Sequence, residues 1–269
     1  MRGWFSRDYE PVDAVEPGGS VSFHAPAAFW AWEADVEPEP PEGAGHPLYG
    51  PIEVRGARAG QALVVHVDEV VPRDWGRTWA PGATLTWSLE GETWRCGARA
   101  VRSAPFLGVI GMPPPEPGEH PTTPPRRWGG NIDCKELVAG TTLYLPIPVD
   151  GALLMAGDGH GAQGDGEVSG TAVECPLERV TLTLDVDDRD LRSPIARTAE
   201  SWIAFGFDED LDLAAEQAIE TMLDLMELEL GAPRPECLAL ASVAVDLRVT
   251  QVVNQVKGVH AVLRDDAIR

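Results

Sequence analysis

The 269-residue sequence has little positive charge, since 21 lysine and arginine residues stand against 43 aspartate and glutamate residues, for a formal net charge of -22. That balance excludes a nucleic-acid binder or a partner of anionic membranes, because both surfaces would repel the protein. Long apolar runs are also absent. No stretch approaches the roughly 20 apolar residues of a transmembrane helix, and the first residues lack the apolar segment of a signal peptide. We therefore expect a cytoplasmic protein.

Cysteine is scarce, and its spacing excludes further kinds of site. The four cysteines lie far apart without a Cys-x-x-Cys pair, so neither a zinc knuckle nor a redox pair is predicted. A Gly-x-Ser-x-Gly elbow is missing too, which argues against a serine nucleophile. Apolar residues make up 43% of the chain, which is enough for a substantial globular core.

Short alternating segments separated by glycine and proline dominate the first two hundred residues. Alternation is typical of half-buried strands, and helical spacing begins only after residue 205, which favours an antiparallel sandwich or barrel over a βαβ array. Two proline-dense pieces, 37–47 and 112–127, are predicted to be long loops, because proline donates no hydrogen bond to a sheet ladder. Such loops serve either as binding-site lids or as rigid surface connections.

After Gly206, apolar residues recur at helical spacing and predict an amphipathic helix that ends before Gly231 and Pro233. The next segment begins at helical spacing and ends in alternation, so we expect a short helix that leads into a strand. The predicted fold is mainly β with an α+β C-terminal part, in which the amphipathic helix packs on an antiparallel sandwich-like or barrel-like core. We expect a β-rich region at 1–200 and a C-terminal region at 201–269, packed together as one compact unit.

The segment Gly157–Glu167, GDGHGAQGDGE, places three acids, a histidine and a glutamine between apolar runs. A second polar cluster upstream contains Asn131, Asp133 and Lys135. The apolar segments between them, TTLYLPIPV and GALLMAG, are predicted to form a hairpin that brings the two clusters together. Aspartate, histidine and glutamate donors suit Zn²⁺ or a similar divalent ion. The alternative is that the glycines shape a hairpin turn and the acids bond its backbone.

The stretch 124–174, which begins PPRRWGGNIDCKELVAG and ends GDGEVSGTAVE, closely resembles the central signature of the acetamidase/formamidase family. Segments 50–70 and 242–263 are similar to family segments in the same order, so the resemblance extends over most of the chain. It implies hydrolysis of a short aliphatic amide to a carboxylate and ammonia, with a metal such as zinc. Trp128 and Ser169 depart from the family pattern, which has histidine at the first position and cysteine or glycine at the second.

The resemblance also implies a set of metal ligands and catalytic groups. We expect Asp133, Asp158 and His160 to hold a divalent metal ion, with zinc as the expected ion. Glu167 is the expected general base, because amide hydrolysis needs a group that takes a proton from water and passes it to the leaving nitrogen. His160 is also a candidate for acid–base catalysis. Lys135 is expected either to stabilise the developing oxyanion or to hold a carboxylate in place.

Asn131 and Gln163 can both donate and accept hydrogen bonds, so they suit recognition of the substrate amide. The expected partner is a small-molecule amide, and a symmetric homo-oligomer is expected on general grounds. Two alternatives stay open: a lactam-opening hydrolase of the same family, and a non-catalytic metal-binding module of the same fold. The role of His260 and the place of the N-terminal tryptophans, either in the pocket or in the core, also stay open.

Overall fold

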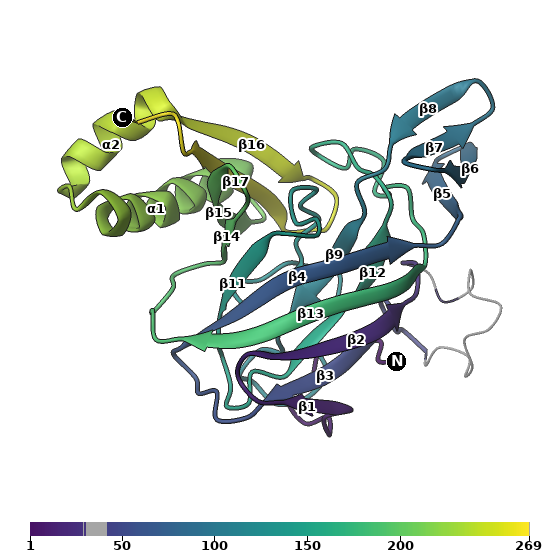
Figure 1. Ribbon diagram of the computed structural model, residues 1–269, viewed down its shortest axis with the longest axis horizontal. Coiled ribbons are helices and arrows are strands. Elements are labelled where there is room, and N and C mark those ends of the chain that lie inside the picture. Colours follow the sequence, from purple (N-terminus) through teal and green to yellow (C-terminus); the bar gives the residue numbers. More distant parts are fainter. Residues whose placement is uncertain (29, 31–41, 269) are drawn as a thin grey trace.

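The computed structural model describes residues 1–28, 30 and 42–268, and its strands form three sheets (Figure 1). The first sheet contains, in order of pairing, β1 (Asp13–Val15), β3 (Leu48–Val54), β12 (Leu154–His160), β9 (Phe106–Gly111) and β10 (Gly129–Asn131). The second contains β16 (Val245–Gln251), β17 (Lys257–Arg264), β15 (Ser201–Asp208), β14 (Ile195–Arg197), β11 (Thr142–Pro146), β4 (Ala62–Pro72), β13 (Leu177–Asp187) and β2 (Gly19–Ala25). The third contains β5 (Trp75–Ala80), β6 (Ala83–Glu90), β7 (Thr93–Cys96) and β8 (Arg99–Arg102).

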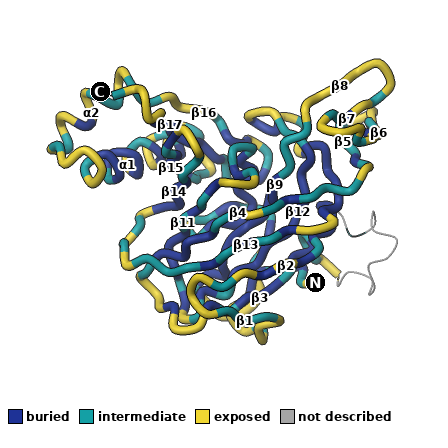
Figure 2. The backbone as a smooth tube through the Cα atoms, viewed as in Figure 1, coloured by how far each residue is buried: buried dark blue, intermediate teal, exposed yellow. Residues whose placement is uncertain are grey.

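Among these strand pairs only β1–β3 is parallel, so the predicted mainly β, antiparallel architecture is confirmed. Apolar side chains of the two large sheets form the main core between them, as Val65 and Leu182 of the second sheet and Ile52 and Leu154 of the first illustrate. Figure 2 shows the inner strands of the first sheet as buried along their length. Every residue of β12 is buried, which places the polar side chains of this strand in the interior.

The β5–β8 sheet projects from one end of the molecule (Figure 1). Its root is held by Trp94, which is fully buried and whose Nε1 donates to the backbone oxygen of Gly161 at 3.0 Å. Trp87 is buried as well, whereas Trp79 is 48% exposed. The N-terminal tryptophans are therefore divided between core and surface, and Trp32 lies outside the described residues.

The C-terminal part carries the predicted helix and the predicted helix-to-strand transition. Helix α1 (Leu211–Leu230) begins after Asp210, whose carboxylate caps the first turn, and ends at Gly231 with a left-handed φ of 63°. Helix α2 (Arg234–Ala244) runs directly into β16. Strands β15 to β17 join the second sheet through β14, so residues beyond 200 share a sheet with β4 and β11. Neither helix of the described residues is long and apolar enough to cross a membrane.

The predicted hairpin between the two central apolar strands is wrong, because β11 belongs to the second sheet and β12 to the first. Pro146 and Pro148 donate no backbone hydrogen bond and end the first strand, and the chain then crosses between sheets. On the way Ile147 N donates to Gln61 O at 2.8 Å, and Gly151 N donates to Ala57 O at 2.9 Å. Residues 112–127 form the predicted loop between β9 and β10, whereas 37–41 of the earlier loop lie outside the described residues.

Candidate functional site

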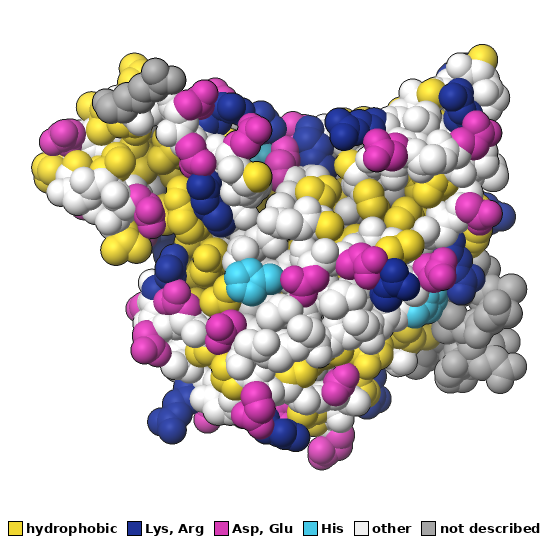
Figure 3. Space-filling model, viewed as in Figure 1, with side chains coloured by type: hydrophobic (Ala, Val, Ile, Leu, Met, Phe, Trp, Pro, Cys, Tyr) yellow, Lys and Arg dark blue, Asp and Glu magenta, His cyan; other side chains and the backbone are white. Residues whose placement is uncertain are grey.

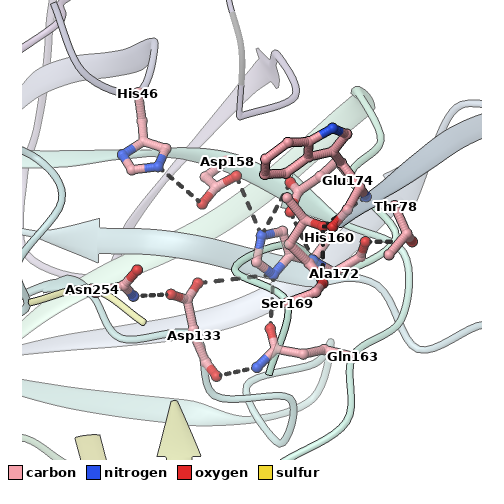
Figure 4. Close-up of polar contacts among 12 residues, drawn as sticks. His46, Thr78, Asp133, Asp158, His160, Gln163, Ser169, Ala172, Glu174 and Asn254 are labelled. Atoms are coloured by element: carbon pink, nitrogen blue, oxygen red, sulfur yellow. Dashed lines mark hydrogen bonds and ion pairs between the residues drawn. The ribbon is translucent and has the colours of Figure 1, made fainter. Parts of the chain in front are cut away.

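Four buried acids lie around one buried histidine beside the inner strands of the first sheet. Figure 4 shows three of them, Asp133, Asp158 and Glu174, with His160. Asp158 and His160 lie inside β12, and Asp133 follows β10. Glu167 and Glu174 come from the segment between β12 and β13. None of the five side chains belongs to a residue more than 6% exposed. The alternative in which Asp158 only bonds the backbone of a hairpin turn does not fit, because Asp158 sits within a buried strand.

Three of the acids have a positive backbone φ, a conformation that residues other than glycine rarely adopt. The φ angles are 52° at Asp133, 60° at Asp158 and 44° at Glu167. Each such position costs on the order of 1–3 kcal/mol and persists only where the surrounding structure enforces it, typically at functional sites. The surrounding structure therefore holds these three carboxylates in place against an unfavourable backbone conformation.

The imidazole of His160 is held by contacts on both nitrogens. Its Nε2 lies 3.3 Å from Asp158 Oδ1 and 3.3 Å from Glu174 Oε2. Its Nδ1 lies 3.0 Å from Gln163 Oε1 and 3.9 Å from Asp133 Oδ1. Gln163 in turn donates from Nε2 to the backbone oxygen of Asp133 at 2.7 Å, so the ring and both chain segments are fixed together.

Burial and mutual repulsion shift the ionisation of these groups. Burial raises the pKa of Asp133 to about 6 and that of Glu174 to about 7. Burial, reinforced by the charge of Asp133, raises the pKa of Glu167 to about 10. For Asp158 the opposing effect of burial is outweighed by His160, and the pKa falls to about 2. Burial would also lower the pKa of His160, but Glu174 and Asp158 raise it well above its ordinary value.

The oxygen atoms of the cluster fit a divalent metal ion. Asp133 Oδ1, Asp158 Oδ1 and Glu174 Oε2 are buried without a hydrogen bond of good geometry from any described residue, and the last two share the single His160 Nε2 at 3.3 Å each. Leaving buried acceptors unpaired is costly unless a cation compensates them. Asp133, Asp158 and His160 each offer a donor atom within 4.8 Å of the others, and so do His160, Glu167 and Glu174. Carboxylate oxygens with an imidazole nitrogen are donors that zinc and similar ions accept.

Gly108 on β9 leaves the space in which three of these side chains meet. A Cβ atom there would lie 2.6 Å from Asp158 Oδ2, 2.7 Å from Asp133 Oδ1 and 2.9 Å from His160 Cε1. Real Cβ atoms essentially never approach other atoms so closely. Any larger residue at position 108 would therefore push the proposed ligands apart.

Three further residues of the site were not predicted from the sequence. They are Glu174, Asn254 and His46. Asn254 donates from Nδ2 to Asp133 Oδ2 at 2.5 Å, and His46 Nε2 lies 3.9 Å from Asp158 Oδ2. Glu174 and Asn254 lie at the end of 124–174 and within 242–263, the stretches that carry the family resemblance. Their polarity inside otherwise apolar surroundings was the available signal, whereas for His46 the signal was its place on the proline-dense piece 37–47, from which it could reach the site.

The structure brings most of the predicted site residues together: Asp133, Asp158, His160, Gln163 and Glu167. Lys135 instead forms an ion pair with Asp165 at 2.9 Å, and both side chains are about one-third exposed. That contact corresponds to the expectation that Lys135 holds a carboxylate. Asn131 is 2% exposed at the end of β10, and its Oδ1 accepts no hydrogen bond from the described residues. His260 on β17 is fully buried, with Nδ1 2.8 Å from Thr250 Oγ1.

Comparisons with known proteins agree with this fold. Residues 118–263 match the model of the Acetamidase/Formamidase family. The crystal structure of an acetamidase from Bacillus halodurans superposes with a TM-score of 0.89 at 30% identity, covering 98% of this chain and 94% of that one. A predicted acetamidase/formamidase from Thermoanaerobacter tengcongensis gives a TM-score of 0.90 at 26% identity over 98% and 93%. A gamma lactamase from Delftia acidovorans shares the fold, with a TM-score of 0.64 at 20% identity over 97% and 88%.

Matches to curated relatives are shorter. An acetamidase from Mycolicibacterium smegmatis is 48% identical over 48 residues, which are 18% of this chain and 12% of that protein. A putative formamidase from Schizosaccharomyces pombe is 26% identical over 196 residues, which cover 46% of this chain and 47% of that protein. The chain thus spans less than half the length of these two relatives.

Proposed function

The chain belongs to the acetamidase/formamidase family, and we propose that it is a metal-dependent amidohydrolase that cleaves the C–N bond of a short linear amide to a carboxylate and ammonia. The observation that carries this proposal is the buried cluster around His160, in which four acids share one imidazole and one oxygen each of Asp133, Asp158 and Glu174 has no hydrogen bond of good geometry from the described part of the chain. A cluster that served only to shape a turn would have no need to bury unpaired carboxylates.

Asp133, Asp158 and His160 are the proposed ligands of one divalent ion, and zinc is the proposed ion because it accepts mixed carboxylate and imidazole donors. When bound, such an ion supplies Lewis-acid polarisation of a carbonyl group and lowers the pKa of water. Gln163 contacts His160 Nδ1 and Asn254 contacts Asp133 Oδ2, so these two residues orient the ligands, and Glu174, whose Oε2 lies 3.3 Å from His160 Nε2, is a further proposed donor.

Glu167 is the proposed general base. It takes a proton from the attacking water and delivers it to the leaving nitrogen, so that ammonia departs rather than an amide anion. Burial and the charge of Asp133 raise the pKa of Glu167, which opposes the first half of this role, so the role requires the positive charge of the bound ion to lower that pKa again. Gln163, anchored on His160 and Asp133, and Asn131 are the proposed groups that recognise the amide.

Lys135 is the remaining proposed catalytic residue. Because Lys135 is paired with Asp165, the role that fits its geometry is to hold that carboxylate at the edge of the site. Direct stabilisation of the oxyanion would require this ion pair to open. A Lys135→Met variant separates the two roles, since loss of kcat with unchanged KM would assign it to the oxyanion.

The experiment that tests the function combines elemental analysis with ammonia release from formamide, acetamide, a longer amide and a γ-lactam, before and after chelation. We expect about one divalent ion per chain and chelator-sensitive release from linear amides. Release from the lactam alone would favour the lactam-opening alternative. A metal-binding protein inactive on the whole panel would favour the non-catalytic module, and a metal-free protein that stays inactive after zinc addition would refute the proposal. Light scattering tests the proposed homo-oligomer, and cell fractionation its proposed cytoplasmic location.

A further inference from the structure

A pocket of about 480 Å³ lies beside the carboxylate cluster, between the β5–β8 sheet and the segment that follows β12. Gln163 and Glu167 are among its lining residues, so the pocket opens directly onto two of the groups assigned to catalysis. A volume of this size lies in the range of sites that enclose molecules much larger than formamide or acetamide. Either of those amides would occupy only a small part of it.

The wall of this pocket is largely apolar. Trp87 and Val101 contribute from the β5–β8 sheet, while Ala162, Val168 and Val173 contribute from the segment after β12. Val168 is 84% exposed and Val101 is 39% exposed, and neither belongs to a described core cluster. In Figure 3, hydrophobic side chains gather where the β5–β8 projection joins the body of the molecule. Exposed apolar side chains beside a pocket are typical of a binding site.

The apolar wall is connected to the carboxylate cluster by a chain of hydrogen bonds. Trp87 donates from Nε1 to Thr78 Oγ1 at 3.0 Å, and Thr78 donates from Oγ1 to the backbone oxygen of Ala172 at 2.6 Å. The backbone nitrogen of Ala172 donates to Glu174 Oε1 at 2.8 Å, and Glu174 contacts His160. Trp87 therefore has a fixed position relative to the cluster, as a preorganised binding wall requires.

We propose that this pocket binds the acyl group of the substrate, and that the preferred substrates are primary amides with an uncharged, apolar acyl group larger than acetyl. This inference rests on the proposed function and names the substrate class of the same site. An apolar acyl group would be removed from water against Trp87, Val101 and Val168, which strengthens binding in proportion to the area buried. Asp165 and Arg102 both line the pocket and Asp165 is paired with Lys135, so the lining offers a charged acyl group no net opposite charge, and such a group would lose hydration against the apolar wall.

A chain-length series tests the assignment. We would measure kcat/KM for acetamide, butyramide, hexanamide and phenylacetamide with the metal-loaded protein. Each added methylene is expected to raise kcat/KM about fourfold until the pocket is filled, because burying one methylene stabilises a complex by about 0.8 kcal/mol. Values that stay level or fall from acetamide to hexanamide would overturn the acyl-pocket assignment and leave amide hydrolysis intact.

Paired variants test the wall itself. The double variant Val101→Ser with Val168→Ser should lower the hexanamide-to-acetamide ratio of kcat/KM at least about fivefold, since apolar contact area is lost. Val243→Ser is the matched control, because Val243 is also 84% exposed but lies on α2, away from this pocket. An unchanged ratio accompanied by a changed mass in light scattering would show that the valines form an interface between copies, and would refute the proposal.

The experiments distinguish failure of the proposed amide hydrolysis from failure of the acyl-pocket assignment. Absence of ammonia from every amide would overturn the proposed hydrolysis alone. Calorimetric binding of hexanamide and acetamide to the wild type and to the double variant would then decide the pocket assignment. Tighter binding of hexanamide that weakens in the double variant supports it, whereas equal binding of the two amides refutes it.

Discussion

Substitution of Gly108 by alanine is the sharpest perturbation that the site offers. The added Cβ would lie 2.6 to 2.9 Å from atoms of Asp158, Asp133 and His160. Ordinary contact of a Cβ begins near 3.4 Å, so these atoms would have to move apart by about 0.5 to 0.8 Å. Metal sites tolerate ligand displacements of only about 0.2 Å, so the proposed ligands could not keep their geometry.

The expected size of the effect follows from that displacement. One extra methyl group in a tightly packed interior costs about 1–3 kcal/mol. If this cost falls on metal binding, the affinity drops between about fivefold and 150-fold. If it falls on folding instead, the melting temperature drops by about 2–4 °C per kcal/mol for a chain of this size. Either way, Gly108→Ala should lose metal under mild chelation before the wild type does.

The assay is a chelator titration followed by elemental analysis and by residual ammonia release. Gly164→Ala is the matched control, because a Cβ at Gly164 meets no atom within 4 Å and no positive φ opposes it. We expect this control to keep its metal at wild-type chelator concentrations. If Gly108→Ala binds metal as tightly as the wild type and keeps its activity, then Asp133, Asp158 and His160 are not the ligands.

Three other predictions concern single residues. Glu167→Gln should lower kcat about 10²–10⁴-fold while elemental analysis still finds the metal, and an active variant would remove Glu167 from its role. Glu174→Gln should weaken metal binding about 10–100-fold, because Glu174 Oε2 contacts Nε2 of the proposed ligand His160; unaltered affinity in a metal competition assay would contradict this. Asp210→Ala should cost about 1 kcal/mol of stability in denaturant unfolding, since the Asp210 carboxylate caps α1; an unchanged midpoint would argue against the cap.

Features set by local sequence were predicted well. The alternation in residues 61–71 corresponds to β4, and the helical spacing that ends before Gly231 corresponds to α1. Helix caps, helix ends and hydrophobic periods of two or 3.6 residues depend on residues that are neighbours along the chain. They can therefore be read directly from the sequence. The prediction of β11 and β12 as a hairpin failed because the sheet that a strand joins depends on partners far away.

The same distinction applies to the site. Residues inside the central signature, such as Asp158 and Gln163, were predicted and are brought together by the fold. His46, on a proline-dense loop that could reach the site, and Asn254 received no predicted role, because they approach Asp158 and Asp133 only through tertiary packing. Glu174 is the last residue of the signature, but its role was not predicted, since its contact with His160 depends on how the segment after β12 turns back.

The crossing of the chain from β11 to β12 ties the site to the completion of folding. Asn254, near the C-terminal end of the chain, bonds Asp133 across 121 positions of sequence, so the cluster cannot assemble on a nascent chain that lacks its last strands. Any ligand that binds this cluster therefore recognises only the finished fold and leaves the unfolded chain unstabilised. By mass action, a ligand present at a hundred times its Kd adds about 2.7 kcal/mol to the stability of the whole chain. Ligand concentration then sets how strongly the chain resists unfolding.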